Sequence, residues 1–219
     1  MTKLAIFDLD GTLLDTVKDL GNATNHALTE CGFPTHPIEA YYQMVGRGIY
    51  NLFRAAVLAG QSTEEVVQRM ASIFIPYYDA HKCDFTRPYD GIPGMLKTIT
   101  AAGVRLAVAS NKYQDGAEKL VHHFFGEYDF VRILGQREGQ PIKPDPAIVD
   151  QVLAEVPSVT KSETVYVGDS NVDMQTGLNA GVRTVGVSWG FRTREELAAY
   201  SPSAIVDTPE ELSRVILGA

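Results

Sequence analysis

Apolar and β-branched residues occur in short runs along the chain, and from about residue 90 onward these runs alternate with stretches of helical length. A run of this length indicates a buried strand, whereas apolar positions three or four residues apart indicate an amphipathic helix. The alternation predicts an α/β fold in which helices cover a parallel sheet. The expected strands are Leu4 to Phe7, Leu106 to Ala109, Phe130 to Leu134, Thr164 to Val167, Thr184 to Val187 and Ala204 to Val206.

The section between the first two strands is different, because it has helical periodicity and no convincing strand from about Thr16 to His81. An all-helical stretch inserted directly after strand one predicts a small second domain over the C-terminal edge of the sheet. The predicted division is a core of residues 1–14 and 85–219 and a helical cap domain of residues 15–84. The return segment, residues 85–94, is rich in proline and glycine and is interpreted as a hinge.

Three helices are expected within the cap domain. Ser62 and Glu65 fit a capping box at the start of the third, as Thr208 and Glu211 do for the last helix of the chain. The expected cap helices are Val17 to Cys31, ended by Gly32, Ile49 to Ala59, ended by Gly60, and a long helix that begins near Ser62.

The composition fits one medium-sized domain with a smaller insertion, since 219 residues with 45% hydrophobic content can bury a sizeable core. The net charge is -8, and no run of lysine and arginine of the kind that follows a phosphate backbone is present. Nucleic acid is therefore excluded as a bulk partner. We expect a monomer or a homodimer that acts on a small molecule.

The chain contains only two cysteines, Cys31 and Cys83, without the spacing of a zinc or redox motif. Both are expected to be reduced thiols that are buried or half-buried. The N-terminal apolar stretch is short and interrupted by an acid, and no later apolar run approaches the length that spans a membrane. These features predict a cytoplasmic protein without a membrane partner.

Carboxylates follow two of the expected strands. The first strand runs into IFDLDGTLLD, with Asp8 and Asp10 at its end, and the strand Thr164 to Val167 runs into Asp169 and Asp173. The carboxyl ends of parallel strands share one edge of a sheet, so these acids can converge in one crevice. Carboxylates so close together need a shared cation, and oxygen-only ligands favour Mg²⁺.

Two further segments supply groups that complement the acids. Ser110 and Asn111 end a strand beside a following helix, where a hydroxyl and free backbone N–H groups commonly hold phosphate oxygens. Lys143, placed just before a helix by neighbouring prolines, can act as a point charge on a phosphoryl group. Carboxylates, metal, hydroxyl and ammonium together indicate phosphoryl chemistry.

The spacing of the two N-terminal aspartates predicts a two-step mechanism. Asp8 can attack phosphorus in line to give an aspartyl-phosphate. Asp10 would protonate the leaving oxygen and then take a proton from the attacking water. For this it must begin protonated, and a neighbouring carboxylate is an influence that raises a carboxyl pKa. Gly11 would allow the tight turn that follows, and Thr12 would add a hydroxyl nearby.

Four motifs in this order resemble those of the haloacid dehalogenase-like hydrolases over nearly the whole chain. The resemblance implies a Rossmann-like core with a helical cap inserted after strand one. It also implies that Asp8 is the nucleophile, that Asp10 is the acid and base, and that Mg²⁺ is bound by Asp8, the Asp10 carbonyl and Asp169. The four motifs are Asp8-Leu9-Asp10-Gly11-Thr12, Ser110-Asn111, Lys143-Pro144, and Gly168-Asp169-Ser170 with Asp173.

The same resemblance implies further roles. Asp173 would support either the metal site or Lys143. Within the family, the chain length, the cap and the segments 186–190 and 193–197 look most like phosphoglycolate phosphatases. Ser170 stands where the family often has threonine, which we expect to be tolerated. It assigns Ser110 and Lys143 as phosphate ligands, and from the residues themselves we expect Thr12, Arg47 and Asn111 to bind substrate as well.

Several of these residues also have simpler interpretations. Arg47, between two glycines of the cap, could bind a substrate carboxylate or phosphate, or it could be a solvated arginine in a turn. Asp173 could favour a helix N-terminus through the helix dipole, and Ser110 could be a helix cap. The remaining candidates are expected to be packing or solvent-facing residues: His122, His123, Trp189, Tyr77 and Tyr78.

Other functions are compatible with parts of the pattern. A sugar phosphomutase resembling β-phosphoglucomutase, or a broad-specificity sugar or nucleotide phosphatase, would use the same core. A dehalogenase has no evident use for Asp10, and a phosphonate hydrolase needs a cap lysine, whereas Lys18 and Lys82 lie only at the cap edges. A phospho-acceptor receiver domain carries its aspartate on a middle strand. The favoured function is a Mg²⁺-dependent phosphatase for a small phosphorylated metabolite, such as 2-phosphoglycolate.

Overall fold

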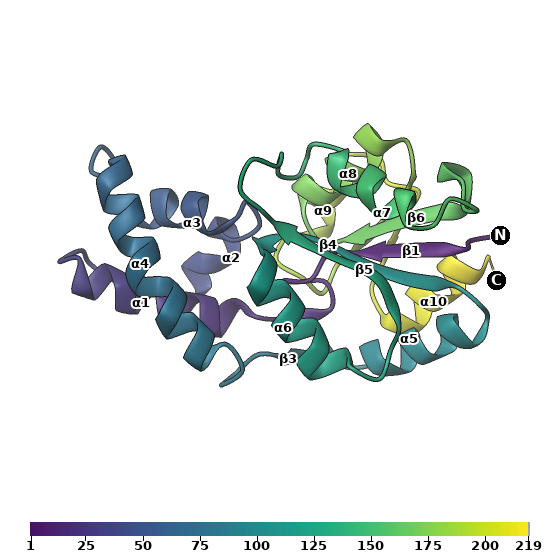
Figure 1. The fold of residues 1–219 in the computed structure, drawn as a ribbon, viewed down its shortest axis with the longest axis horizontal. Helices are drawn as coiled ribbons and strands as arrows, with labels where there is room; N and C mark the ends of the chain where they lie inside the picture. Colours follow the sequence, from purple (N-terminus) through teal and green to yellow (C-terminus); the bar gives the residue numbers. More distant parts are fainter. Residues whose placement is uncertain (219) are drawn as a thin grey trace.

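The computed structural model describes residues 1–218, and six parallel strands form its central sheet in the order β5-β4-β1-β6-β7-β8 (Figure 1). All six expected strands are present, and β4 continues four residues beyond its predicted end. The strands are β1 (Leu4–Phe7), β4 (Arg105–Tyr113), β5 (Phe130–Gln136), β6 (Thr164–Gly168), β7 (Arg183–Val187) and β8 (Ala204–Val206).

Helices cover both faces of this sheet, which explains why its strands are continuous apolar runs. Ala5 and Phe7 of β1 face the helices on one side of the sheet, the first layer, and Leu4 and Ile6 face the helices on the other side, the second layer. This arrangement confirms the predicted fold class. The first layer contains α5 (Ile92–Ala101), α6 (Gln114–Phe125) and α10 (Pro209–Leu217), and the second contains α7 (Ala147–Ala154), α8 (Asn171–Ala180) and α9 (Arg194–Ala198).

Residues 17–81, inserted after β1, form a separate helical unit beside the sheet (Figure 1). Its own apolar core is built around aromatic side chains, including Phe53, Phe74 and Tyr78. An inserted all-helical cap is therefore present, while the limits proposed for it, residues 15–84, stay a prediction. Its helices are α1 (Val17–Glu30), a short 3₁₀ helix (Ile38–Ala40), α2 (Tyr41–Met44), α3 (Ile49–Ala56) and α4 (Glu64–His81).

Two short strands, β2 (Leu14–Asp15) and β3 (Arg87–Pro88), pair antiparallel where the chain enters and leaves the cap. The sequence predicted no strand here, because two residues are too few to show a period. The pairing holds the two connections side by side. The return segment is therefore partly strand rather than only a hinge loop.

Details of the helix ends correct three expectations. Thr63, not Ser62, caps α4, because its hydroxyl accepts the Val66 N–H at 3.3 Å. Thr208 caps α10 as expected, but the Glu211 carboxylate accepts from the Asp207 N–H instead of completing a capping box. Helix α3 ends at Ala56, before the predicted Ala59, since Val57 is extended and buried.

The two cysteines differ in their exposure to solvent. Cys31 is half-buried as expected, whereas Cys83 is exposed, which corrects the expectation for that thiol. His122 and His123 are exposed. Among residues 1–218, no helix is long and apolar enough to cross a membrane.

Candidate active site

The end of β1 carries Asp8 and Asp10 into a tight turn. The Asp8 N–H continues the sheet by donating to the Val167 carbonyl at 2.9 Å. Gly11 then adopts a φ of +87°, and a Cβ at this position would collide with the Asp169 carboxylate. A glycine is therefore required here both for its backbone conformation and for the close approach of Asp169.

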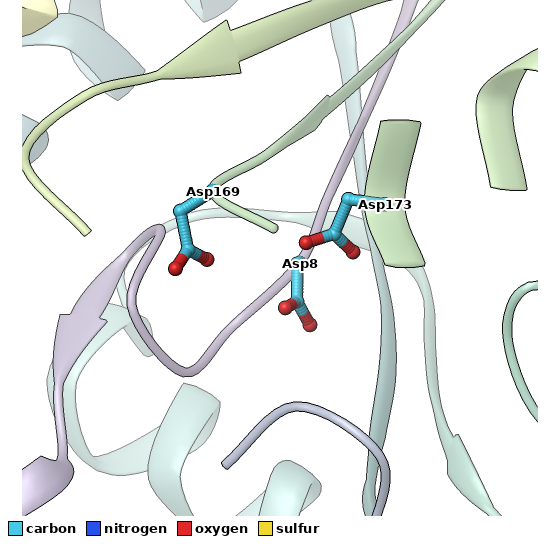
Figure 2. A group of neighbouring side chains, drawn as sticks. All are labelled: Asp8, Asp169 and Asp173. Atoms are coloured by element: carbon cyan, nitrogen blue, oxygen red, sulfur yellow. The ribbon is translucent and has the colours of Figure 1, made fainter. Parts of the chain in front are cut away.

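Asp8, Asp169 and Asp173 bring three carboxylates together from β1, the end of β6 and the first turn of α8 (Figure 2). One oxygen of each lies within 4.8 Å of the others, and all three side chains are buried. Burial first, and then the charge of Asp173, raise the pKa of Asp8 to about 6. Burial, with Asp173 and Asp8, raises the pKa of Asp169 to about 8. Ionised carboxylates this close repel one another, and a nearby positive charge offsets the repulsion.

The donor set fits a hard cation such as Mg²⁺, since it consists only of carboxylate oxygens. Asp169 is oriented by the Thr12 hydroxyl on one oxygen and the Phe191 N–H on the other, both at 2.8 Å. Among residues 1–218, the buried Asp8 Oδ1 has no polar partner other than the Lys143 ammonium, which lies 3.0 Å away. Among residues 1–218, the Asp10 carboxylate is not part of this group, and metal binding by the Asp10 carbonyl stays a prediction.

Lys143 lies against the same cluster. Its Nζ is 2.6 Å from Asp173 Oδ1, 3.0 Å from Asp8 Oδ1 and 3.0 Å from the Tyr166 hydroxyl. Burial alone opposes a charged amine, but Asp173 and Asp8 raise the pKa of Lys143 well above its ordinary value. The side chain is therefore an ammonium ion inside the site.

Asn111 fixes the backbone of Lys143 by a reciprocal pair of hydrogen bonds. Its Oδ1 accepts from the Lys143 N–H at 2.8 Å, and its Nδ2 donates to the Lys143 carbonyl at 3.1 Å. The same Nδ2 also donates to the Gly46 carbonyl of the cap at 3.1 Å. Asn111 thus connects the lysine segment, the end of β4 and the cap.

An irregularity in β4 directs consecutive side chains into the site. The pairing with β5 shifts between Ala109 and Tyr113, so that residues 110–112 bulge out of the regular ladder. Bulges of this kind redirect side chains that would otherwise alternate between two faces. Ser110, Asn111 and Lys112 consequently line one cavity together with Asp8 and Asp10.

Lys112 is a site residue that the sequence reasoning missed. Its Nζ lies 3.1 and 3.3 Å from the two Asp10 oxygens and 2.8 Å from the Tyr78 hydroxyl of α4. The only charged neighbours expected for Asp10 from sequence were carboxylates, whereas the structure places the Lys112 ammonium against it. The position of Lys112 directly after Ser110-Asn111 was the available signal, but the strand was predicted to end at Ala109, so the direction of the Lys112 side chain could not be predicted.

The cap closes over the inner cavity. The cavity measures about 30 Å³ and its cap-side wall includes Gly46, Gly48 and Ile49. Ligand pockets usually measure about 300–1,000 Å³, so a substrate can enter only after the cap has moved. Arg192 holds the cap from the core side by donating to the carbonyls of Tyr42 and Val45.

Arg47 is not brought together with the carboxylates. Its side chain is exposed and lines a separate pocket of about 670 Å³ between cap and core, together with Arg192 and Tyr200. The glycines on either side of it, Gly46 and Gly48, line the inner cavity. Arg47 therefore stands at the outer side of the cap wall.

The sequence matches one family model and several proteins of known name. The family model described as haloacid dehalogenase-like hydrolase matches residues 5–187. A phosphoglycolate phosphatase of Psychrobacter arcticus is 32% identical over 99% of this chain and 96% of its own length. A phosphoglycolate phosphatase of Pseudomonas syringae pv. tomato is 34% identical over 100% of this chain and 80% of its own length.

A solved structure shows the same arrangement of cap and core. The crystal structure of a candidate phosphoglycolate phosphatase from Lactobacillus delbrueckii subsp. bulgaricus matches with a TM-score of 0.90 and 33% identity, and the match covers 100% of both chains.

Proposed function

The chain belongs to the haloacid dehalogenase-like hydrolases, and we propose that it is a Mg²⁺-dependent phosphatase that hydrolyses 2-phosphoglycolate through an aspartyl-phosphate on Asp8. The observation that carries the proposal is the grouping of the Asp8, Asp169 and Asp173 carboxylates around the Lys143 ammonium. The relatives named above suggest the substrate, because they are phosphoglycolate phosphatases and the match to this chain covers most of their length.

In the proposed first step, an Asp8 oxygen attacks phosphorus while the bond to the leaving oxygen breaks. Asp10 donates its proton to that oxygen, so that glycolate leaves as an alcohol. The Lys143 ammonium and the Ser110 hydroxyl hold phosphoryl oxygens, and Thr12 keeps Asp169 in place. A Mg²⁺ ion held by Asp8, the Asp10 carbonyl and Asp169 would supply charge neutralisation on the phosphoryl oxygens.

In the second step, water attacks the aspartyl-phosphate. Asp10 takes one proton from this water, and the phosphorus–oxygen bond to Asp8 breaks to release inorganic phosphate. The two steps restore Asp8 and Asp10 to their starting states. Asn111 maintains the lysine segment and the cap loop during both steps through its hydrogen bonds to Lys143 and Gly46.

The proposed domain division, with the cap at residues 15–84, fits this chemistry because substrate must enter a cavity of about 30 Å³ that the cap covers. Movement of such caps commonly sequesters a reaction from bulk water. In a phosphatase, the closed cavity must still admit one water molecule for the second step.

The test is phosphate release with Mg²⁺ from 2-phosphoglycolate, sugar phosphates, nucleoside monophosphates and pyrophosphate, compared by kcat/KM. A preference of several orders of magnitude for 2-phosphoglycolate is expected. Similar values for all esters would instead indicate a broad-specificity phosphatase. Conversion of one sugar phosphate isomer to another without net phosphate release would indicate a mutase.

A further inference from the structure

Lys112 is buried at the boundary between core and cap, with 4% of its surface exposed. Its ammonium contacts the Asp10 carboxylate on the core side and the Tyr78 hydroxyl on the cap side. Tyr78 is itself fully buried and stacks on Phe74 with a ring separation of 5.2 Å. Packing therefore fixes the cap-side partner of the lysine.

The Asp10 carboxylate depends on this lysine for its orientation. Within residues 1–218, the hydrogen bonds to Asp10 side-chain oxygens all come from Lys112 Nζ. The Asp10 side chain is 9% exposed, so bulk solvent has little access to it. A hydrogen bond from an ammonium donor is charge-assisted, so it restricts both side chains more strongly than a bond between neutral groups would.

A rigid orientation has a chemical consequence at this position. A general acid must lie within hydrogen-bond reach of the atom that it protonates, and small displacements lower the rate steeply. The Lys112 side chain reaches Asp10 because the β4 bulge turns residues 110–112 into the cavity. The lysine and the aspartate are thus in direct contact in the lining of the inner cavity.

We propose that Lys112 is a positioning residue that holds the Asp10 carboxylate for proton transfer to the leaving group, and that the Tyr78 hydroxyl ties this position to the docked cap. The inference rests on the proposed role of Asp10 as acid and base. It assigns a function in the reaction to a cap residue, Tyr78, that touches no part of the carboxylate cluster.

If Lys112 positions Asp10, alkyl and aryl phosphate esters should respond differently to the loss of this lysine. An alkyl ester has a poor leaving group that must be protonated, whereas p-nitrophenolate leaves without a proton. Loss of Asp10 positioning therefore slows alkyl esters selectively. A lysine that bound substrate charge directly would instead distinguish 2-phosphoglycolate, which carries a carboxylate, from ethyl phosphate, which does not.

The experiment measures kcat and KM of Lys112→Met with 2-phosphoglycolate, ethyl phosphate and p-nitrophenyl phosphate. General acid–base catalysis contributes about 10²–10⁴-fold, so we expect kcat for both alkyl esters to fall by about 10- to 100-fold. With p-nitrophenyl phosphate we expect a much smaller loss. The ratio of alkyl to aryl rates within one preparation does not depend on the fraction of folded enzyme.

Two further variants complete the design. Tyr78→Phe keeps the ring and removes the hydroxyl, and it is expected to lower the same ratio by a smaller factor. Lys119→Met is the matched control, because Lys119 also contacts the cap, through Asp79 at 3.2 Å, but has no hydrogen bond to Asp10. Its ratio of alkyl to aryl rates should equal that of the wild type.

Three results would overturn the inference. An equal loss with all three esters would mean that Lys112 is only structural, and a loss confined to 2-phosphoglycolate would mean that it binds the substrate carboxylate. If Tyr78→Phe has the same ratio of alkyl to aryl rates as the wild type, the Tyr78 hydroxyl does not connect the position of Asp10 to the cap. If the wild-type enzyme releases phosphate from none of the esters, the proposed function fails together with the inference.

Discussion

The Lys143 ammonium lies 2.6 Å from the Asp173 carboxylate, and both side chains are almost completely buried. The other Asp173 oxygen accepts from the backbone and the hydroxyl of Ser170 at the start of α8. Asp173 therefore contacts Lys143 and is also part of the N-terminal cap of α8. One side chain combines the contact with Lys143 that the resemblance implied and a place at the helix N-terminus.

Asp173→Asn is expected to destabilise the protein and to lower phosphatase activity. Removing one partner of a buried ion pair typically costs about 3–5 kcal/mol, and here Asp8 remains beside Lys143, so we expect about 1–3 kcal/mol. Urea unfolding measures this change. The control is Asp150→Asn, since Asp150 also lies in the first turn of a helix and pairs with a lysine, Lys161, but at the surface. Equal effects for the two variants would contradict the proposed importance of burial.

Asp8→Asn is expected to abolish phosphate release while the fold is retained. The change removes the nucleophile, and losses of nucleophiles lower kcat by about 10⁴-fold or more. Because burial already opposes the Asp8 charge, the neutral amide should shift Tm by less than about 4 °C, equivalent to about 1 kcal/mol in a chain of this size. Phosphate release near the wild-type rate would exclude Asp8 as the nucleophile.

Mg²⁺ is expected to stabilise the protein more at high pH than at low pH. The folded-state pKa values of Asp8, about 6, and Asp169, about 8, lie above their ordinary value of 3.8. In the metal-free protein, their contribution to stability is therefore fully present below pH 3.8 and is lost as the pH rises through 6 and 8. Cation binding requires the deprotonated acids, so the loss is reversed when the ion binds.

Thermal unfolding with and without Mg²⁺, at about pH 5 and about pH 9, measures this effect. The increase in Tm should be larger at the higher pH and should disappear in Asp169→Asn. A Mg²⁺-induced increase that is independent of pH, or that persists in Asp169→Asn, would place the cation elsewhere. Chelation of divalent ions should also stop phosphate release, and added Mg²⁺ should restore it.

We propose that Arg47 contacts substrate once the cap has moved. Arg47→Ala is then expected to raise KM for 2-phosphoglycolate by roughly 10-fold with little change in Tm, because a charged hydrogen bond to substrate would be lost without disturbing packing. Arg47 is exposed, and the glycines beside it line the inner cavity. The control is Arg54→Ala on α3, where the arginine pairs with Glu64 at the surface. Unchanged KM values would show that Arg47 is the solvated turn residue considered from sequence.

Much of the site could be predicted because its residues occupy recognisable places at the ends of strands. Asp8, Asp169 and Lys143 follow apolar runs or precede a helix, and parallel strands bring such ends to one edge. Their convergence follows from the fold class rather than from fine geometry. The helical insertion after β1 was predictable for the same reason, since its period differs from that of the strands around it.

Other features of the fold and the site were not indicated by the pattern of residues around them. The β2–β3 pair is too short to show an alternation of apolar and polar residues. Ser62 and Thr63 are both suitable N-cap residues for α4, and the sequence could not distinguish between them. Phe191, whose N–H fixes Asp169, lies in a loop with no pattern that points to the site. Lys112 lies in a bulge that interrupts β4, beyond Ala109, where the sequence predicted that this strand would end.

The α/β core, the position of the helical insertion and the acids at the strand ends could be read from the residues alone, because these depend on hydrophobic period and on the order of elements. The partners of the charged groups come from the packed fold, which places Asp173 against Lys143 and Lys112 against Asp10 and leaves the Arg47 side chain exposed. These pairings join residues far apart in the chain, and charge–charge contacts depend on distances that only the packed fold sets.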